Sequence, residues 1–489
     1  MRQPAGPGKS FCIAALTAVA AFAATELARA ADAKVPKGDE IKKKLQDLYN
    51  GSIPQDNGSA RAGVIVEVGK IIDKDKNNTA MKNAEFWTDA IQEGRFTGNP
   101  KKTLGTKNKV MADELVFTLK DGKEAKTKMY YRAGAMVSAS KPAPLVVSVL
   151  DKATDPQQYL ASAWGDAKTE YGKDWVLVAI VEGDTFPCAK EPKLLAFPFV
   201  RIGEHFNVDA NRWYLEGVGG ATDAVQIAAT EYMSCRLAGL ILRGPAKAVV
   251  NECSTLYPTL VVRGQTSDPG KATFEAYKKI DEKNNAEVVV ADLPTVNLPN
   301  DAISAWVAQH PKRVTPAAWP WVTTFPANAN EDAETWTGCV ELGAAGKRGE
   351  KTKLTVKYIR DTNSVDVQCE NLSEFVVHMN DDLLDLDKEV TVFVNGKENL
   401  KKSVDRKLTD LIALADTYGE YGRVFSASLR CVVPVPIAPP PGPAPDAKGG
   451  DNPPADKPAD KPADKPADKP ADKPADKPAD PPPGNPPPK

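Results

Sequence analysis

Three glycines near the middle of the chain mark the place where covalent catalysis would be expected. Residues 209–225 begin with polar side chains, continue as a short apolar run at 213–215, and break at Gly217, Gly219 and Gly220 before a helical pattern of small residues. A strand, a tight turn and a helix in this order can present a serine nucleophile in the pattern G-x-S-x-G. The layout therefore predicts a turn suited to acyl transfer.

The turn itself supplies no nucleophile. The pattern is occupied by Gly217, Val218, Gly219, Gly220 and Ala221, so a glycine stands where serine is required, and a shift by one residue puts Val218 there. Covalent catalysis needs a side chain such as a hydroxyl, thiol, amine or carboxylate, and neither residue has one. The backbone N–H groups of such a turn, at a helix N-terminus, are still expected to offer a site for an anion or a carbonyl oxygen.

Alternating strands and helices are expected to position this turn. Continuous apolar runs, typical of strands buried on both faces, occupy residues 144–150, 175–181 and 259–263. The helical patterns that alternate with them cover residues 157–170, 271–281 and 300–308. This alternation predicts an α/β fold, with a mainly parallel sheet and helices on both faces.

Other strand patterns are antiparallel. Residues 114–119 and 126–132 flank Asp121-Gly122, a strong hairpin signal ahead of the first buried strand. After residue 350, several segments alternate as half-buried strands do, and Asn395-Gly396 marks another hairpin turn. We expect this later region to be a small, mostly antiparallel β domain.

The two ends of the chain have the composition of export and spacer segments. A basic start precedes an apolar run at residues 11–24, and Ala28 and Ala30 fit a signal-peptidase site. Six consecutive Pro-Ala-Asp-Lys units within residues 434–489 favour an extended, solvated chain. This tail could be a tether at the cell envelope or a solubilising extension, and composition does not separate the two roles.

These features divide the chain into six expected parts. They are a signal peptide at 1–30, an N-terminal helical appendage at 31–109, an α/β domain at 110–315, a linker at 316–349, a small β domain at 350–433 and a disordered proline-rich tail at 434–489. No segment after the signal is apolar enough for a transmembrane helix. The mature chain is expected to be exported, to a periplasm, the cell surface or the medium.

The charge and the cysteine content of the chain bear on its possible partners, disulfides and metal sites. The formal net charge of −2, with both signs interspersed, does not support a nucleic-acid partner.

Loss of Cys12 with the signal leaves six of the seven cysteines, an even number that permits disulfides in an exported chain. The candidate pairs are Cys235 with Cys253, and Cys339 or Cys369 with Cys431. No Cys-x-x-Cys spacing or neighbouring His indicates zinc, so no metal or other cofactor is expected.

The chain resembles the α/β-hydrolase family, in its secreted esterase and peptidase-like branch. The resemblance covers about residues 125–310. It is carried by the hairpin before the first buried strand, by Asp-x-x-Arg-x-Tyr-Leu-x-Gly at 209–217, and by a strand followed by Gly-x-x-x-Asp ending at Asp268. The later β domain looks like a C-terminal module of some bacterial members. The resemblance implies a Ser–Asp–His triad that hydrolyses ester or peptide bonds.

Only the acid of that triad has a candidate in its expected place. Asp268 fits by context, although Pro269 follows it, whereas residues 292–299, where the His is expected, contain none. His205 is the candidate nearest the expected pocket among the three histidines, as a ligand group or a relocated base. An ordinary loop histidine is the favoured alternative, because no nucleophile is paired with it.

Two further sets of residues have a chemical and a structural interpretation. Thr222 and Asp223 could act as substitute polar groups, but a helix N-terminus prefers both residue types for capping. Trp319 and Trp321, with Trp306 nearby, could form a ligand platform, although such aromatic residues more often pack a domain junction.

An acidic cluster after residue 380 has the same two interpretations. Its members are Asp381, Asp382, Asp385 and Asp387. The cluster lacks the glycine and the terminal bidentate glutamate of an EF-hand, so a solvated surface is favoured over a calcium site.

Three hypotheses about function follow. The leading one is an exported, catalytically inactive α/β-hydrolase-like protein that binds an unidentified small molecule, peptide or envelope component, or has a structural role there. The alternative is an active secreted hydrolase with a non-standard site, such as His205 with Asp268. In the third, the β domain and the tail mediate adhesion and the α/β domain has no activity. An enzyme needs a nucleophile or metal within reach of a base, which separates the second hypothesis from the first.

Overall fold

The computed structural model describes residues 35–49, 58–98, 108–162, 173–244, 247–262, 268–284, 290–291, 300–313, 318–324, 336–419 and 421–434. The segments expected to be a signal peptide and a proline-rich tail lie outside these residues. Among the described helices, none is long and apolar enough to cross a membrane.

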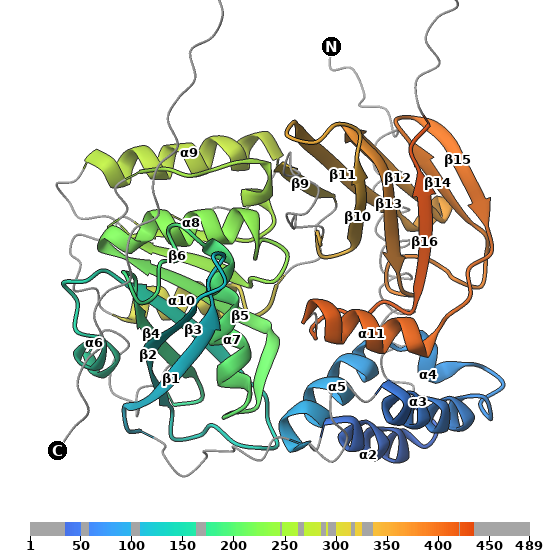
Figure 1. Ribbon diagram of the computed structural model, residues 1–489, viewed down its shortest axis with the longest axis horizontal. Coiled ribbons are helices and arrows are strands. Elements are labelled where there is room, and N and C mark those ends of the chain that lie inside the picture. The colour runs from blue at the N-terminus through green and yellow to red at the C-terminus, as the bar shows by residue number, and fades with distance from the viewer. Residues whose placement is uncertain are drawn as a thin grey trace, which may run out of the picture. The chain divides into compact units, whose positions relative to one another are not determined.

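The first described part of the chain is helical. Its helices are α2 (Gly38–Tyr49), α3 (Gly58–Ile72), α4 (Thr79–Lys82) and α5 (Ala84–Gly98). Ile41, Leu45 and Leu48 recur at helical spacing on α2 and are buried. They belong to one hydrophobic cluster with Trp87 of α5 and with α11 (Leu408–Tyr418), which Figure 1 shows beside these helices. The N-terminal helices therefore share their core with a helix from near the other end of the described chain.

An eight-stranded sheet forms the centre of the next part. Its strands are β1 (Met111–Thr118), β2 (Glu124–Ala133), β3 (Ala143–Leu150), β4 (Val176–Val181), β5 (Val208–Val218), β6 (Gly239–Arg243), β7 (Thr259–Val262) and β8 (Val290–Ala291). They lie in the order β1-β2-β4-β3-β5-β6-β7-β8. β2 is antiparallel to both of its neighbours, and the pairs from β4 to β8 are parallel. The Asp121-Gly122 hairpin and the mainly parallel sheet are thereby confirmed.

Helices cover both faces of this sheet, because side chains alternate along its buried strands. On β3, Leu145 and Val147 pack on one face, in a cluster that includes residues of α7 (Ala196–Gly203), α8 (Thr222–Glu231) and α9 (Asp268–Asn284). Val146 and Leu150 pack on the other face, with α6 (Pro156–Ser162) and α10 (Asn300–Gln309). The predicted fold class, α/β with helices on both faces, is confirmed.

The last described part holds two further sheets. One has the order β10-β13-β16 and the other β15-β14-β12-β11-β9. Their strands are β9 (Trp319–Thr324), β10 (Val340–Ala345), β11 (Lys351–Ile359), β12 (Ser364–Glu370), β13 (Leu372–Met379), β14 (Val390–Val394), β15 (Lys397–Lys402) and β16 (Ala427–Val432). All pairs are antiparallel except β12 with β14. The region is mostly antiparallel, as expected.

The linker expected at residues 316–349 instead contributes two strands to these sheets. β9 pairs with β11, and β10 pairs with β13. Trp319 and Trp321 of β9 are both buried, as is Trp306 of α10. Their packing fixes β9 as a strand and excludes an exposed aromatic platform.

No disulfide joins the six cysteines that were expected to pair, all of which are described. Cys369 lies on β12 of the five-stranded sheet, whereas Cys431 lies on β16 of the other. Cys253 Sγ donates to Pro320 O at 3.5 Å, and Cys431 Sγ to Leu429 O at 3.8 Å. These thiols serve as core residues with carbonyl acceptors, which corrects the expected pairings.

A buried histidine on β13 makes the stability of this region depend on pH. His378 Nδ1 lies 2.9 Å from Ser428 Oγ, and burial lowers the His378 pKa from 6.5 to about 4. Because the unfolded chain binds the proton first, the free energy of unfolding should fall as pH decreases from 6.5 to about 4. The loss should reach about 3 kcal/mol. Urea unfolding across this pH range, compared with His378→Gln, measures it, and equal slopes for the two proteins would refute it.

Candidate functional site

The glycine turn is built as the sequence predicts. β5 ends at Val218, a single 3₁₀ turn covers Gly219–Ala221, and α8 begins at Thr222. Gly219 has φ +59°, a left-handed conformation that strains other residues. A Cβ at Gly217 would lie 2.9 Å from Thr222 Cα, so only glycine allows the helix to pack this close to the strand. Together with the strand order described above, this turn at the end of the central β5 gives the α/β domain the α/β-hydrolase-like fold that the sequence predicts.

A carboxylate occupies the place of the missing nucleophile. A Cβ built on Gly219 would lie 2.0 Å from Asp151 Oδ2, far inside van der Waals contact. The same oxygen accepts a hydrogen bond from Gly220 N at 3.4 Å. The expected anion site at this turn is therefore filled by a side chain of the protein itself. Val218, the alternative nucleophile position, is buried in the core.

Other donors hold Asp151 in this position. Asp151 follows β3, and its Oδ1 accepts from Thr154 Oγ1 at 2.8 Å and from Ala153 N at 3.2 Å. β3 and β5 pair in parallel with Val149 opposite Gly217, which brings Asp151 beside Gly219. The carboxylate is thus fixed by the sheet register and by its own loop.

The polar residues after the turn do not replace the nucleophile. Thr222 is buried, and its hydroxyl donates to Gly219 O at 2.8 Å. That bond closes the turn, so the hydroxyl is committed to structure. Asp223 is the next residue of α8, and one of its oxygens, Oδ1, is buried without a hydrogen-bond partner in the described chain.

The structure places His205 near the beginning of β5, at the opposite end of this strand from the glycine turn. His205 precedes β5, whereas Gly219 follows it, and the eleven residues of the strand separate them by roughly 30 Å. His205 Nε2 lies 2.8 Å from Asp113 Oδ2, which also accepts from Arg201 Nε at 2.7 Å. Burial alone would raise the Asp113 pKa, but the hydrogen bonds from Arg201 and His205 outweigh it and lower that pKa. His205 is therefore part of an ion-pair network and has no access to the turn.

The remaining triad candidates do not complete a site. Asp268 is the first residue of α9, but its side chain lies outside the described residues. Residues 292–299, expected to carry the triad histidine, also lie outside them. His310 Nδ1 is 2.9 Å from Trp306 O at the end of α10, and His378 lies on β13. The described chain brings no histidine to Gly219.

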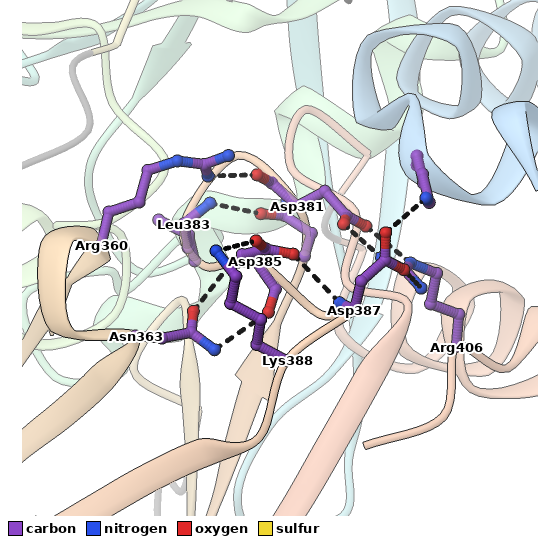
Figure 2. Close-up of polar contacts among 10 residues, drawn as sticks. Arg360, Asn363, Asp381, Leu383, Asp385, Asp387, Lys388 and Arg406 are labelled. Atoms are coloured by element: carbon purple, nitrogen blue, oxygen red, sulfur yellow. Dashed lines mark hydrogen bonds and ion pairs between the residues drawn. The ribbon is translucent and has the colours of Figure 1, made fainter. Parts of the chain in front are cut away.

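The acidic cluster forms ion pairs in place of a metal site (Figure 2). Arg406 donates to Asp381 at 2.9 Å and to Asp387 at 2.9 Å. Lys82 of α4 also donates to Asp387, at 2.6 Å, and these partners lower the Asp387 pKa. Among the described residues, no group of three or more His, Cys, Asp or Glu side chains could hold a metal ion. The cluster instead links the N-terminal helices to the β sheets.

A buried polar group just below the turn is not foreseen from the sequence. Glu216 of β5 accepts from Ser148 Oγ of β3 at 2.5 Å and from Arg243 Nε of β6 at 2.5 Å. All three side chains are buried. Burial lowers the Arg243 pKa, but the charge of Glu216 outweighs it and raises that pKa. A charged residue directly after each of two short apolar runs, at 213–215 and 240–242, is the only sequence signal of this pair.

Of the comparisons with known proteins, the one with solved structures found partial similarity. No protein-family model and no curated protein sequence matches the chain. Among solved structures, a thermostable esterase is 15% identical, with a TM-score of 0.30, over 42% of this chain and 61% of its own. Poly(aspartic acid) hydrolase-1 from Sphingomonas sp. KT-1 is 11% identical, with a TM-score of 0.31, over 42% of this chain and 98% of its own. A putative dipeptidyl aminopeptidase IV from Bacteroides ovatus is 12% identical, with a TM-score of 0.33, over 42% of this chain and 36% of its own.

Proposed function

We propose that this chain is an exported, catalytically inactive α/β-hydrolase-like protein with a binding or structural role at the cell envelope. One observation carries the proposal of inactivity. The Asp151 carboxylate occupies the position where a nucleophilic side chain at residue 219 would begin, and it accepts from the Gly220 N–H. A substrate carbonyl therefore finds neither a nucleophile nor that free backbone donor at this turn.

The electrostatics of the turn oppose acyl transfer as well. Acyl transfer develops negative charge on the carbonyl oxygen, and that charge needs hydrogen-bond donors around it. A carboxylate held at the same place repels the developing charge. Export is supported by the composition of residues 1–30, and a role at the envelope is compatible with the proline-rich tail.

Reaction with a serine-directed reagent and a substrate panel tests the proposal. The purified protein should form no covalent adduct with an alkyl fluorophosphonate by intact mass. It should not hydrolyse short-chain nitrophenyl esters or aminoacyl anilides above buffer. His205→Ala is the matched variant, because His205 is the relocated base of the competing hypothesis, and it should behave like the parent.

Two results would overturn the proposal. One is an adduct that peptide mapping places on a residue near Gly219. The other is turnover that co-purifies with the protein and is lost in His205→Ala, which would establish an active hydrolase with a relocated site.

A further inference from the structure

A cavity lies near the beginning of β5, at the opposite end of this strand from the glycine turn. It has a volume of about 90 Å³, is partly open to solvent, and is lined by residues of α5, α7 and β5 and by Tyr421. One water needs only about 10–15 Å³ of such space, so the cavity can hold a small organic molecule. Four aromatic side chains line it besides Tyr421, namely Phe96, Phe199, Phe206 and Trp213.

Arg95 supplies the cavity with a cation that has no carboxylate bonded to it. Its Cζ lies 3.4 Å from the centroid of the Tyr421 ring. Among the described residues, no hydrogen bond or ion pair engages its guanidinium, which carries five N–H donors. Arg95 is half-buried, and burial lowers its pKa against the opposing charges of Asp416 and Glu204. An anion that reached this guanidinium would gain a desolvated, charge-assisted bond.

The other charged residue of the cavity already has its partner. Glu204 accepts from Arg201 Nη1 at 2.5 Å, and Arg201 Nε donates to Asp113 at 2.7 Å. Arg201 therefore offsets the two carboxylates on this side. Glu204 and Asp416 also act on Arg95 through their charges, but neither forms a hydrogen bond or ion pair with its guanidinium among the described contacts.

The indole N–H of Trp213 is a second donor in the cavity lining that has no hydrogen-bond partner among the described residues. Trp213 is only 5% exposed. The amides that line the cavity are in use, since Gln92 Oε1 accepts from Ala210 N and Asn207 Nδ2 donates to Ala139 O. The two unpartnered donors, the Arg95 guanidinium and the Trp213 Nε1–H, favour a ligand group that accepts hydrogen bonds.

We propose that this cavity binds a small organic monocarboxylate. The carboxylate accepts from Arg95 and from the Trp213 indole, and the apolar part of the ligand packs against Phe96, Phe199 and Phe206. The site is separate from the glycine turn, so it goes beyond the proposed function. Its failure would leave the absence of catalysis untouched.

Fluorine NMR of the full chain with trifluorobutyrate tests the site, with trifluorobutyramide as the neutral isostere. The carboxylate should bind at millimolar concentration or tighter, and butyrate should displace it. The amide should bind at least tenfold more weakly, because it presents no charge to Arg95. Arg95→Met, which keeps the apolar stem, should weaken carboxylate binding at least tenfold.

Trp213→Phe provides a second variant that retains the aromatic wall and removes the N–H donor. It should weaken binding several-fold. Trp306→Phe is its control, because the Trp306 Nε1–H is also buried and unpartnered but lies on the other face of the sheet. Equal binding of carboxylate and amide would overturn the proposal. So would undetectable carboxylate binding, or unchanged affinity in both Arg95→Met and Trp213→Phe.

Discussion

Replacing Arg243 by methionine is expected to lower the free energy of unfolding by about 3–5 kcal/mol. Glu216 is completely buried, and Arg243 Nε donates to it at 2.5 Å. Without the guanidinium, the carboxylate keeps the Ser148 hydroxyl but no cation among the contacts described above. A buried charge without its counter-ion either stays at high cost or takes up a proton. Urea unfolding at neutral pH measures the loss.

Two further variants separate burial from charge removal in this experiment. Lys123→Met breaks an exposed pair with Asp121 and should leave the free energy of unfolding nearly unchanged. Glu216→Leu combined with Arg243→Met removes both buried charges and should recover much of the single-variant loss. A small loss in Arg243→Met, similar to that of Lys123→Met, would contradict the buried pair.

Gly219→Ala is expected to destabilise the protein by about 2–3 kcal/mol, through two effects that act at one atom. The left-handed φ of +59° strains any side chain, and the new Cβ would start 2.0 Å from Asp151 Oδ2. The carboxylate must move, which loses its bond from Gly220 N. Gly122→Ala is the matched control, because Gly122 also has positive φ but nothing lies within 4 Å of its Cβ position. An equal loss in the two variants would show that Asp151 does not occupy the turn.

Strands that are apolar throughout could be predicted from the sequence, whereas some other elements could not. β3, β4 and β7 are continuous apolar runs, and their alternation with helices is enough for the fold class. α3 escapes such a prediction because it contains several glycines and β-branched residues, which disfavour helix. Its buried residues, Val68, Ile71 and Ile72, lie in the cluster shared with α2 and α5, so tertiary packing decides its conformation.

In the candidate site, too, some features follow from local sequence and others depend on tertiary structure. The conformation of Gly217 and Gly219 follows from local pattern, because a strand, glycines and a helix are consecutive in the chain. The role of Asp151 does not, because the residue is distant in sequence and reaches the turn only through the pairing of β3 with β5. For the same reason, nearness in sequence made His205 the candidate closest to the expected pocket, although the whole of β5 lies between it and the turn.

The most direct test of the blocked turn is a double-mutant cycle between Asp151 and Gly219. The free energies of unfolding of the parent, Asp151→Ala, Gly219→Ala and the double variant give the coupling between the two positions. If the Asp151 carboxylate occupies the place of the nucleophile, Gly219→Ala should cost about 1–2 kcal/mol less when Asp151 is already alanine, because only the φ strain remains. A coupling free energy of zero would mean that the carboxylate lies elsewhere and that the turn is open.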